Sequence, residues 1–532
     1  MILSFKPPLS FLVLLAWIQI FGLGALNAAD LAAQPTWFPS ESCKSKWSKL
    51  IPKNEHGFRF GIDRDYKEYK ERIDRKNCYK DWNILVYMAA DNNLAPYALW
   101  DLFEMEAGYE SGRRYAGSGV RTDLIAQVEL PEKEIQRIHL FQTPEAPNKS
   151  WSKREYLALK GPDIQSPRVR VSSETGSNHQ GKLEEFLAWG MREYPALNTM
   201  VIVWGHGQGW SSGVRASNSQ FNAESGAASG PFVGRKFTGG IAFDDSDGSY
   251  LSIPELRKSL QNVRMGVNEG KPIDIYLSDA CLMQMGEVAN EISDEARFII
   301  GSAQVQDYLG IPYRRLMYYL NSGTYKKNPE SSIESDDLAY MLAIRVPAIA
   351  RASYSGGNST QGRYSTDAVD KITMSTLSPS ALKYQLIPAI NKLGESLLKF
   401  IEEDELRLGL LTSVIESAPE FQGGGVDFGS FLVLLNVAIS AEAEFVDSTD
   451  GLRSLSKLQT VILTVQQELR MTVLSSAAGN AYLFEDGRSK YLGFSSFSIF
   501  LPNSHTKNRV PDFMKSKFYL QAPKWAEFID LL

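Results

Sequence analysis

Two residues that together have the chemistry of a nucleophile and its proton-transfer partner each follow a continuous apolar run. His206 lies in VIVWGHGQGW, directly after residues 199–204, and Cys281 lies in IYLSDACLMQMGEVANEI, after residues 273–277. A thiolate is the nucleophile that acyl transfer needs, and a neighbouring imidazole both lowers the pKa of a thiol and exchanges its proton. The pair is therefore typical of an enzyme that forms a thioester.

Each of the two residues has a simpler interpretation when it is taken alone. A single cysteine in an apolar region is more often a small buried hydrophobic residue, and glycines around a histidine also mark a tight turn. The GHGQG segment is a weak candidate for a phosphate-binding loop, because its glycine spacing differs from the dinucleotide fingerprint. The chain has only five histidines, so the occurrence of both residues at strand ends favours catalysis.

The residues after Cys281 predict a helix with one apolar face, which Ser278 or Asp279 would cap. A thiol in the first turn of that helix would lie near the positive end of the helix dipole, which stabilises a thiolate. The amides of Gly207 and Cys281 are candidate donors to an oxyanion.

Apolar strands that alternate with helical segments predict the scaffold. Strands separated by helices are typical of a parallel sheet buried on both faces, which indicates a doubly wound α/β fold whose crevice lies outside the carboxyl ends of the strands. The predicted strands are residues 83–89, 123–128, 137–141, 199–204, 273–277 and 298–300, and the predicted helices are residues 96–107 and 182–194.

The remainder of the chain differs in composition. Residues 211–240 are rich in Ser, Gly, Ala and Asn and predict a long exposed loop inside a catalytic domain of residues 82–327. Residues 328–532 form a mainly helical region, with helices expected at 338–350, 378–400 and 431–469. A final strand near 493–501 is a candidate to rejoin the sheet.

The N-terminus predicts export. Lys6 precedes an apolar run that ends near residue 26 and is followed by small residues, which is typical of a secretory signal peptide over residues 1–29; an uncleaved membrane anchor is the alternative. No later segment is expected to reach membrane-spanning length. Residues 30–81 form an N-terminal extension in which Cys43 and Cys78 are candidates for a disulfide in an oxidising compartment. The protein is expected to be secreted or periplasmic.

Composition excludes one class of partner. Hydrophobic residues make up 43% of the chain, charged residues 22%, and the formal net charge is -6. These values lack the basic excess that nucleic acid binding requires. We expect polypeptide substrates, no nucleic acid and no membrane association after the signal peptide is removed.

Four segments resemble the clostripain family of cysteine peptidases, relatives of caspases, legumain and gingipains. They are AADNNL (89–94), VIVWGHGQGW (201–210), FDDSDGSYLSIPELRKSL (243–260) and SDACLMQMGEVANEI (278–292), in the order found in the family, and YLGFSSFSIFLP resembles its closing strand. The resemblance implies a caspase-like sheet, a Cys-His dyad formed by Cys281 and His206, and a pocket in which Asp279 receives a basic P1 side chain. A helix cap is the alternative role for Asp279.

The resemblance is incomplete in one place. Family members often carry Ser-Gln-Glu after the strand that ends at Ile300, whereas this chain has Ser-Ala-Gln there, so Asp307 is the remaining candidate acid. The family also implies activation by cleavage in the loop after the histidine. Arg215, Arg235 and Lys236 are candidate sites for self-processing, and a basic loop with no regulatory role is the alternative.

No cofactor is expected. Calcium dependence is known in the family, and residues 244–249 (DDSDGS) supply many oxygen atoms, but they lack the spacing of an EF-hand and are also typical of a hairpin turn.

Two rival functions are compatible with the same Cys281 and His206 pair. One is an inactive caspase-like binding or scaffold protein, and the other is a transpeptidase that uses the same thioester.

Overall fold

The computed structural model describes residues 53–54, 57–58, 79–107, 109–110, 113–114, 116–119, 121–142, 163–172, 179–210, 239–306, 310–323, 337–354, 373–483 and 488–532. The signal peptide, the Cys43 and Cys78 pair, Asp307 and the basic residues Arg215, Arg235 and Lys236 lie outside the described residues.

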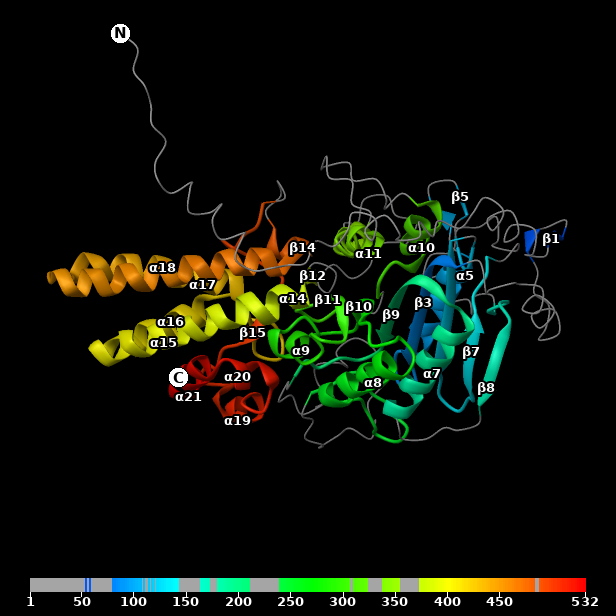
Figure 1. Ribbon diagram of the computed structural model, residues 1–532, viewed down its shortest axis with the longest axis horizontal. Helices are drawn as coiled ribbons and strands as arrows, with labels where there is room; N and C mark the ends of the chain where they lie inside the picture. Colours follow the sequence, from blue (N-terminus) through cyan, green and yellow to red (C-terminus); the bar gives the residue numbers. More distant parts are fainter. Residues whose placement is uncertain are drawn as a thin grey trace, which may run out of the picture.

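A nine-stranded sheet forms the centre of the molecule (Figure 1). Its strands, in order across the sheet, are β14 (Val473–Ala478), β12 (Thr373–Leu377), β11 (Ala296–Gly301), β10 (Ile273–Asp279), β9 (Ala196–Trp204), β3 (Lys80–Ala89), β6 (Thr122–Glu129), β7 (Ile135–His139) and β8 (Arg168–Ser172).

The five central strands are parallel, and the two strands at each edge are antiparallel. The chain starts at β3, continues outward to β6, and then returns to the other side of β3 with β9, β10 and β11. This is the doubly wound order predicted from the apolar runs, and it creates a topological switch point between β3 and β9. The expected fold class is confirmed.

Helices cover both faces of the sheet and bury two separate cores. The helices on one face are α5 (Ala95–Ala107), α10 (Tyr313–Ser322), α11 (Leu338–Ala343) and α12 (Val346–Tyr354). Those on the other are α7 (His179–Glu193), α8 (Ile253–Gly266) and α9 (Gly286–Glu291). Because each central strand is buried on both sides, its side chains are apolar in both alternating sets.

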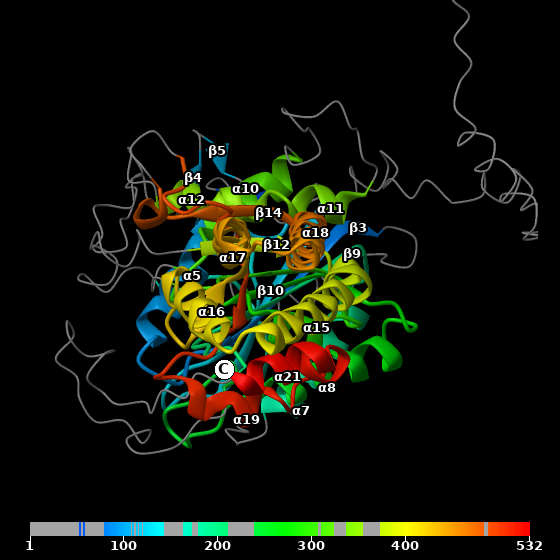
Figure 2. The ribbon, with the colours of Figure 1, turned by 90° about the vertical axis from the view of Figure 1, so that its left-hand side faces the viewer.

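Four helices extend from the sheet as a bundle, seen from the side in Figure 1 and end-on in Figure 2. They are α15 (Ile387–Glu403), α16 (Leu406–Ser417), α17 (Phe428–Glu442) and α18 (Thr449–Thr472). Ser378 caps the short helix α14 (Pro379–Ala381) by accepting a hydrogen bond from Ala381 N. A π-helical segment, Leu382–Leu386, connects α14 to α15. Three further helices close the chain: α19 (Val510–Phe513), α20 (Lys517–Gln521) and α21 (Pro523–Leu531).

The closing strand does not rejoin the large sheet, contrary to the expectation. β15 (Ser498–Phe500) instead pairs antiparallel with β13 (Gly425–Asp427) in a small sheet of its own. The C-terminal region extends the large sheet through β12 and β14, which the sequence did not reveal because both are short and rich in Ser and Thr. The remaining strands form two-residue pairs: β1 (Lys53–Asn54) with β2 (Gly57–Phe58), and β4 (Tyr109–Glu110) with β5 (Arg113–Arg114).

The expectation that no later segment has membrane-spanning length was wrong. Among the described residues, the helical stretch Phe428–Phe445 is long and apolar enough, with a mean hydropathy of 1.4 over 18 residues. Its buried side chains nevertheless belong to the core of the bundle and include Phe428, Phe431, Leu432, Leu435 and Ile439. That packing accounts for its apolar character.

Candidate active site

The register of two neighbouring strands aligns the predicted nucleophile with the predicted proton acceptor. Trp204, the last residue of β9, pairs with Asp279, the last residue of β10, and Gly205 N donates to Asp279 O at 3.3 Å. His206 and Cys281 each stand two residues beyond this pair. The parallel strands therefore release both residues at the same edge of the sheet, beside the switch point.

The backbones of the two turns are in close contact. A Cβ atom placed on Gly207 would lie 2.4 Å from Cys281 O, so a glycine is required there for the turns to approach. Gly209 has a φ of 63°, and a Cβ on it would lie 2.5 Å from Met285 Sδ. These two glycines allow the His206 turn to lie directly against the Cys281 turn.

Asn93 orients the imidazole of His206. Its Oδ1 atom lies 2.7 Å from His206 Nε2. Asn93 follows β3, the strand on the other side of β9, so it comes from the third strand end of the same crevice. Asn93 lies in the AADNNL segment, but sequence reasoning assigned no third residue to the site.

Burial lowers the pKa of His206 to about 4, so the ring is neutral at pH 7. A neutral imidazole carries one proton, and because Asn93 Oδ1 can only accept a hydrogen bond, that proton is on Nε2. Nδ1 is then the nitrogen that can take a proton from a thiol.

Cys281 is half-buried, and its thiol lies against the segment that follows β11. Gln306 N donates to Cys281 Sγ at 3.3 Å, and the thiol lies 3.7 Å from Gln306 O. A backbone N–H donor at this distance stabilises a thiolate more than a thiol.

The prediction that Cys281 begins a helix was wrong, because α9 starts only at Gly286. Leu282 has a left-handed φ of 63°, and residues 282 and 284 bond to the neighbouring segment, through Leu282 N to Gln304 O and Gln284 N to Ser302 O. The predicted caps have other partners: Ser278 Oγ lies 3.1 Å from Tyr276 OH. The helix dipole therefore does not act on the thiol through its first turn.

Asp279 is buried, with an exposed fraction of 4%, and its carboxylate faces four hydrogen bonds. Gln306 Nε2 donates to Oδ1 at 2.6 Å, Tyr313 OH donates to Oδ2 at 2.8 Å, and Ile311 N lies 3.2 Å from both oxygens. The alternative role as a helix cap is excluded, since none of these donors belongs to α9.

Further carboxylates surround the same place. A Cβ on Gly310 would lie 2.9 Å from Asp279 Oδ2 and 3.2 Å from Asp101 Oδ2, so the two side chains converge there. Burial, followed by the charges of Asp279, Asp101 and Glu104, raises the pKa of Tyr313 well above its usual value. The phenol is therefore a donor to Asp279 throughout the neutral pH range, and the region carries a negative potential.

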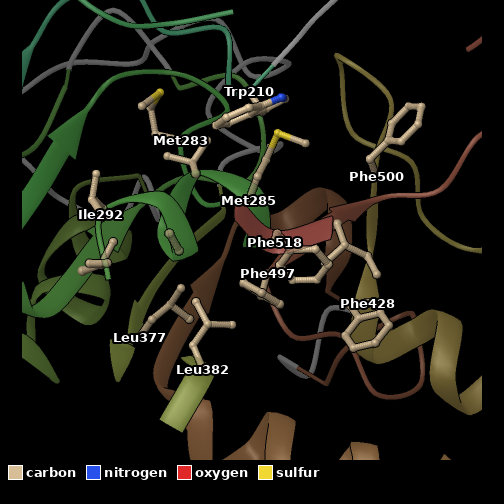
Figure 3. Close-up of a cluster of buried hydrophobic side chains, with 14 of the residues drawn as sticks. Trp210, Met283, Met285, Ile292, Leu377, Leu382, Phe428, Phe497, Phe500 and Phe518 are labelled. Carbon is tan, nitrogen blue, oxygen red and sulfur yellow. The ribbon is translucent and has the colours of Figure 1, made fainter. Parts of the chain in front are cut away.

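The C-terminal region packs against both the His206 turn and the Cys281 turn. Figure 3 shows Trp210, from the His206 turn, and Met283 and Met285, from the Cys281 turn, in one cluster with C-terminal aromatic residues. Trp210 Nε1 also donates to Asp512 O at 3.0 Å. The labelled aromatic residues are Phe428, Phe497, Phe500 and Phe518. The C-terminal region is thus packed into the structure that positions the site.

The acidic segment 244–249 forms a turn. Asp244 Oδ1 accepts hydrogen bonds from Ser246 N at 2.8 Å and Asp247 N at 3.2 Å, and Asp244 N donates to Ser249 O. Within the described ranges, no group of three or more His, Cys, Asp or Glu side chains is arranged to hold a metal ion. The turn interpretation of this segment is the one that the hydrogen bonds support.

Comparison with known proteins identifies the family. The profile of the clostripain family, peptidase family C11, matches residues 86–531. No curated protein matches the chain.

Solved structures are similar to the chain at low sequence identity. The chain is similar to a secreted C11 cysteine protease from Bacteroides thetaiotaomicron, called iotapain, with a TM-score of 0.51, 14% identity, and coverage of 84% of this chain and 99% of that one. It also matches an inactive zymogen of a C11 protease from Parabacteroides distasonis, with a TM-score of 0.49, 16% identity, and coverage of 84% and 98%. The family match covers most of the sequence. The chain therefore belongs to the clostripain family of cysteine peptidases, whose substrates are polypeptides.

Proposed function

We propose that this peptidase is a secreted endopeptidase that cuts after a basic residue, with Cys281 as nucleophile and His206 as its proton-transfer partner. The observation that carries the proposal is the shared register of β9 and β10, from which both residues emerge two positions beyond the paired Trp204 and Asp279. The direct backbone contact between Gly207 and Cys281 supports it further.

The reaction proceeds in two halves. His206 Nδ1 takes the thiol proton as Cys281 Sγ bonds to the scissile carbonyl carbon, and the proton then passes to the leaving amine as the C–N bond breaks. Water attacks the resulting thioester, gives a proton to His206, and releases the acid product as the C–S bond breaks and the thiol is restored. Asn93 keeps the proton of the resting imidazole on Nε2 throughout.

Gly207 is the proposed oxyanion donor together with the amide of Cys281. Among the hydrogen bonds of the described residues, none uses Gly207 N–H, although its neighbours bond to the segment around Ile241. An N–H group held in this way beside the nucleophile is suited to the negative charge that develops on the carbonyl oxygen.

Selectivity for a basic P1 residue rests on the buried carboxylate of Asp279. It lies two residues before the nucleophile, and the nearby Asp101 carboxylate adds to the negative potential, whereas Glu104 lies 3.9 Å from Arg314. A buried negative region stabilises a cationic side chain, particularly one that donates hydrogen bonds to the carboxylate.

Fluorogenic peptides test the function. We expect peptides with Lys or Arg at P1 to be hydrolysed and a matched peptide with Leu at P1 to resist cleavage. Asp279→Asn should lower kcat/KM for the basic peptides by roughly a hundredfold. Asp274→Asn, on the same strand at the far end of the sheet, is the control. Hydrolysis that is equal for all P1 residues would contradict the proposed selectivity. A product whose mass exceeds that of either cleavage fragment would show that an amine, rather than water, resolves the thioester.

We also propose secretion and self-processing, which rest on segments outside the described residues. Secretion predicts that the N-terminus of the mature protein lies near residue 30, after removal of residues 1–29, which N-terminal sequencing checks. Self-processing predicts cleavage near Arg215, Arg235 or Lys236 in the wild-type protein and none in Cys281→Ala. Equal cleavage of both proteins would mean that another peptidase cuts the loop.

A further inference from the structure

The hydrogen-bond donors to the Asp279 carboxylate come from different kinds of group. Tyr313 is the first residue of α10 and Ile311 lies two residues before it; both side chains are fully buried, and the Ile311 donor is a backbone amide. Gln306 Nε2, which donates to Oδ1 at 2.6 Å, comes from an unbranched side chain outside this helix. An entering group can therefore replace Gln306 at Oδ1, whereas Oδ2 stays occupied by Tyr313.

Gln306 also bonds to both of the groups that a bound P1 residue must contact, which are the thiol of Cys281 and the carboxylate of Asp279. Its backbone N–H lies 3.3 Å from Cys281 Sγ, and its side-chain amide reaches Asp279. A bound P1 residue must present its carbonyl to Sγ and its side chain to Asp279. In this structure the Gln306 side chain thus stands where the end of a P1 side chain would bind.

The oxygen of the Gln306 side-chain amide, unlike its nitrogen, is not stabilised by a hydrogen bond within the described residues. The side chain is 93% buried, since its exposed fraction is 7%, and its Oε1 atom accepts no hydrogen bond from any residue that the structure describes. A buried acceptor without a donor is destabilising, and movement of the amide into water removes that cost. Displacement of Gln306 by a cationic N–H is therefore favourable in two ways. Asp279 gains a charged donor, and the Gln306 amide oxygen gains hydrogen bonds from water.

We infer that Gln306 and Tyr313 together leave Asp279 one replaceable acceptor position, and that the pocket therefore selects lysine over arginine at P1. This inference rests on the proposed function. A lysine ammonium is a compact charge whose N–H donates to a single oxygen and can occupy the Oδ1 position. An arginine guanidinium gains its advantage from two parallel N–H···O bonds to both oxygens of a carboxylate. Among the described donors, Tyr313 OH and Ile311 N already bond the second oxygen and so occupy its two lone pairs.

The test uses two fluorogenic peptides that differ only in Lys or Arg at P1. For the wild-type full chain, kcat/KM for the lysyl peptide should exceed that for the arginyl peptide by about tenfold. Tyr313→Phe keeps the ring and releases Oδ2, so the ratio of arginyl to lysyl kcat/KM should rise by roughly tenfold. Tyr319→Phe, on the same helix, should leave the ratio unchanged.

A second variant tests the exchange itself. Gln306→Ala removes the side chain that the substrate displaces, so KM for the lysyl peptide should fall, whereas a merely structural Gln306 would give a higher KM. Val305→Ala is its control. Equal or greater hydrolysis of the arginyl peptide by the wild type would overturn the inference alone, as would an unchanged ratio in a folded Tyr313→Phe. Hydrolysis of neither peptide would overturn the proposed function, and the inference with it.

Discussion

His206 Nε2 lies 2.7 Å from Asn93 Oδ1, and the two residues come from the ends of adjacent parallel strands. Because the amide oxygen can only accept, this contact fixes both the orientation of the ring and the position of its proton. We propose that Asn93 is a positioning residue that acts through His206.

Replacement of Asn93 by Ala should lower kcat by 10- to 100-fold, roughly the effect of losing an orienting partner, with little change in KM. Steady-state kinetics with a basic peptide checks this. Asn93→Asp keeps the oxygen and adds a charge that stabilises the imidazolium, so the acidic limb of its pH profile should move to higher pH. Asn198→Ala, at the opposite end of β9, is the control, and an Asn93→Ala enzyme with wild-type kcat would contradict the assigned role.

The pH dependence should reflect the partly buried imidazole of His206. Burial lowers the pKa of His206 from 6.5 to about 4, so the ring stays able to accept the thiol proton well below pH 6.5. We expect kcat/KM to hold between pH 7 and about pH 5 and to fall as the pH approaches 4. An acidic limb centred near pH 6.5 would show that His206 is solvated as an ordinary histidine.

The same shift has a consequence for stability. The unfolded chain binds a proton at His206 near pH 6.5, whereas the folded chain does so only near pH 4. The contribution of His206 to the free energy of unfolding is thus fully present above about pH 6.5 and is lost as the pH falls through 4.

Gly207→Ala should disrupt the contact between the catalytic turns. The added Cβ would lie 2.4 Å from Cys281 O and 3.0 Å from Ala280 Cβ, so at least one turn must shift. We expect a loss of kcat of at least a hundredfold, since small displacements of reacting groups cost about this much. Gly266→Ala is the matched control, because an added Cβ there meets nothing within 4 Å. Retained activity in Gly207→Ala would argue against the close packing of the two turns.

Phe518 tests the role of the C-terminal region as a support for the site. Its ring is fully buried and would lie 3.1 Å from a Cβ on Gly286, at the start of the helix that follows Cys281. Phe518→Ala should lower the free energy of unfolding by about 3 to 5 kcal/mol, measured by denaturant titration. Leu520→Ala, on the same helix but 72% exposed, should change it little. If the two variants unfold alike, the aromatic cluster does not hold the region to the sheet.

The interior of the sheet could be predicted from the sequence because burial on both faces leaves a continuous apolar run. β3, β6, β9, β10 and β11 each contain the predicted strand. The strands β12 and β14 left no such signal: β12 is fully buried but contains Ser and Thr, and β14 contains Ser and is partly exposed. The predicted helix over 431–469 is in fact α17 and α18, because the apolar spacing continues across the exposed turn at Phe445.

The positions of His206 and Cys281 at one edge of the sheet could be predicted because each residue directly follows its strand, and their catalytic role stays a prediction. Asn93 was within reach for the same reason. Gln306 and Tyr313 were not, since they meet Asp279 across 27 and 34 residues and no local pattern marks them. The helix after Cys281 was placed too early because its apolar spacing continues back through residues whose amides bond instead to residues 302 and 304.

The most direct measurement is covalent labelling with a lysyl chloromethyl ketone peptide, followed by intact mass and peptide mapping. The account predicts one adduct per chain, located on Cys281, absent from Cys281→Ala and formed much more slowly in His206→Ala. An adduct on any other residue, or peptide hydrolysis by Cys281→Ala at the wild-type rate, would contradict it.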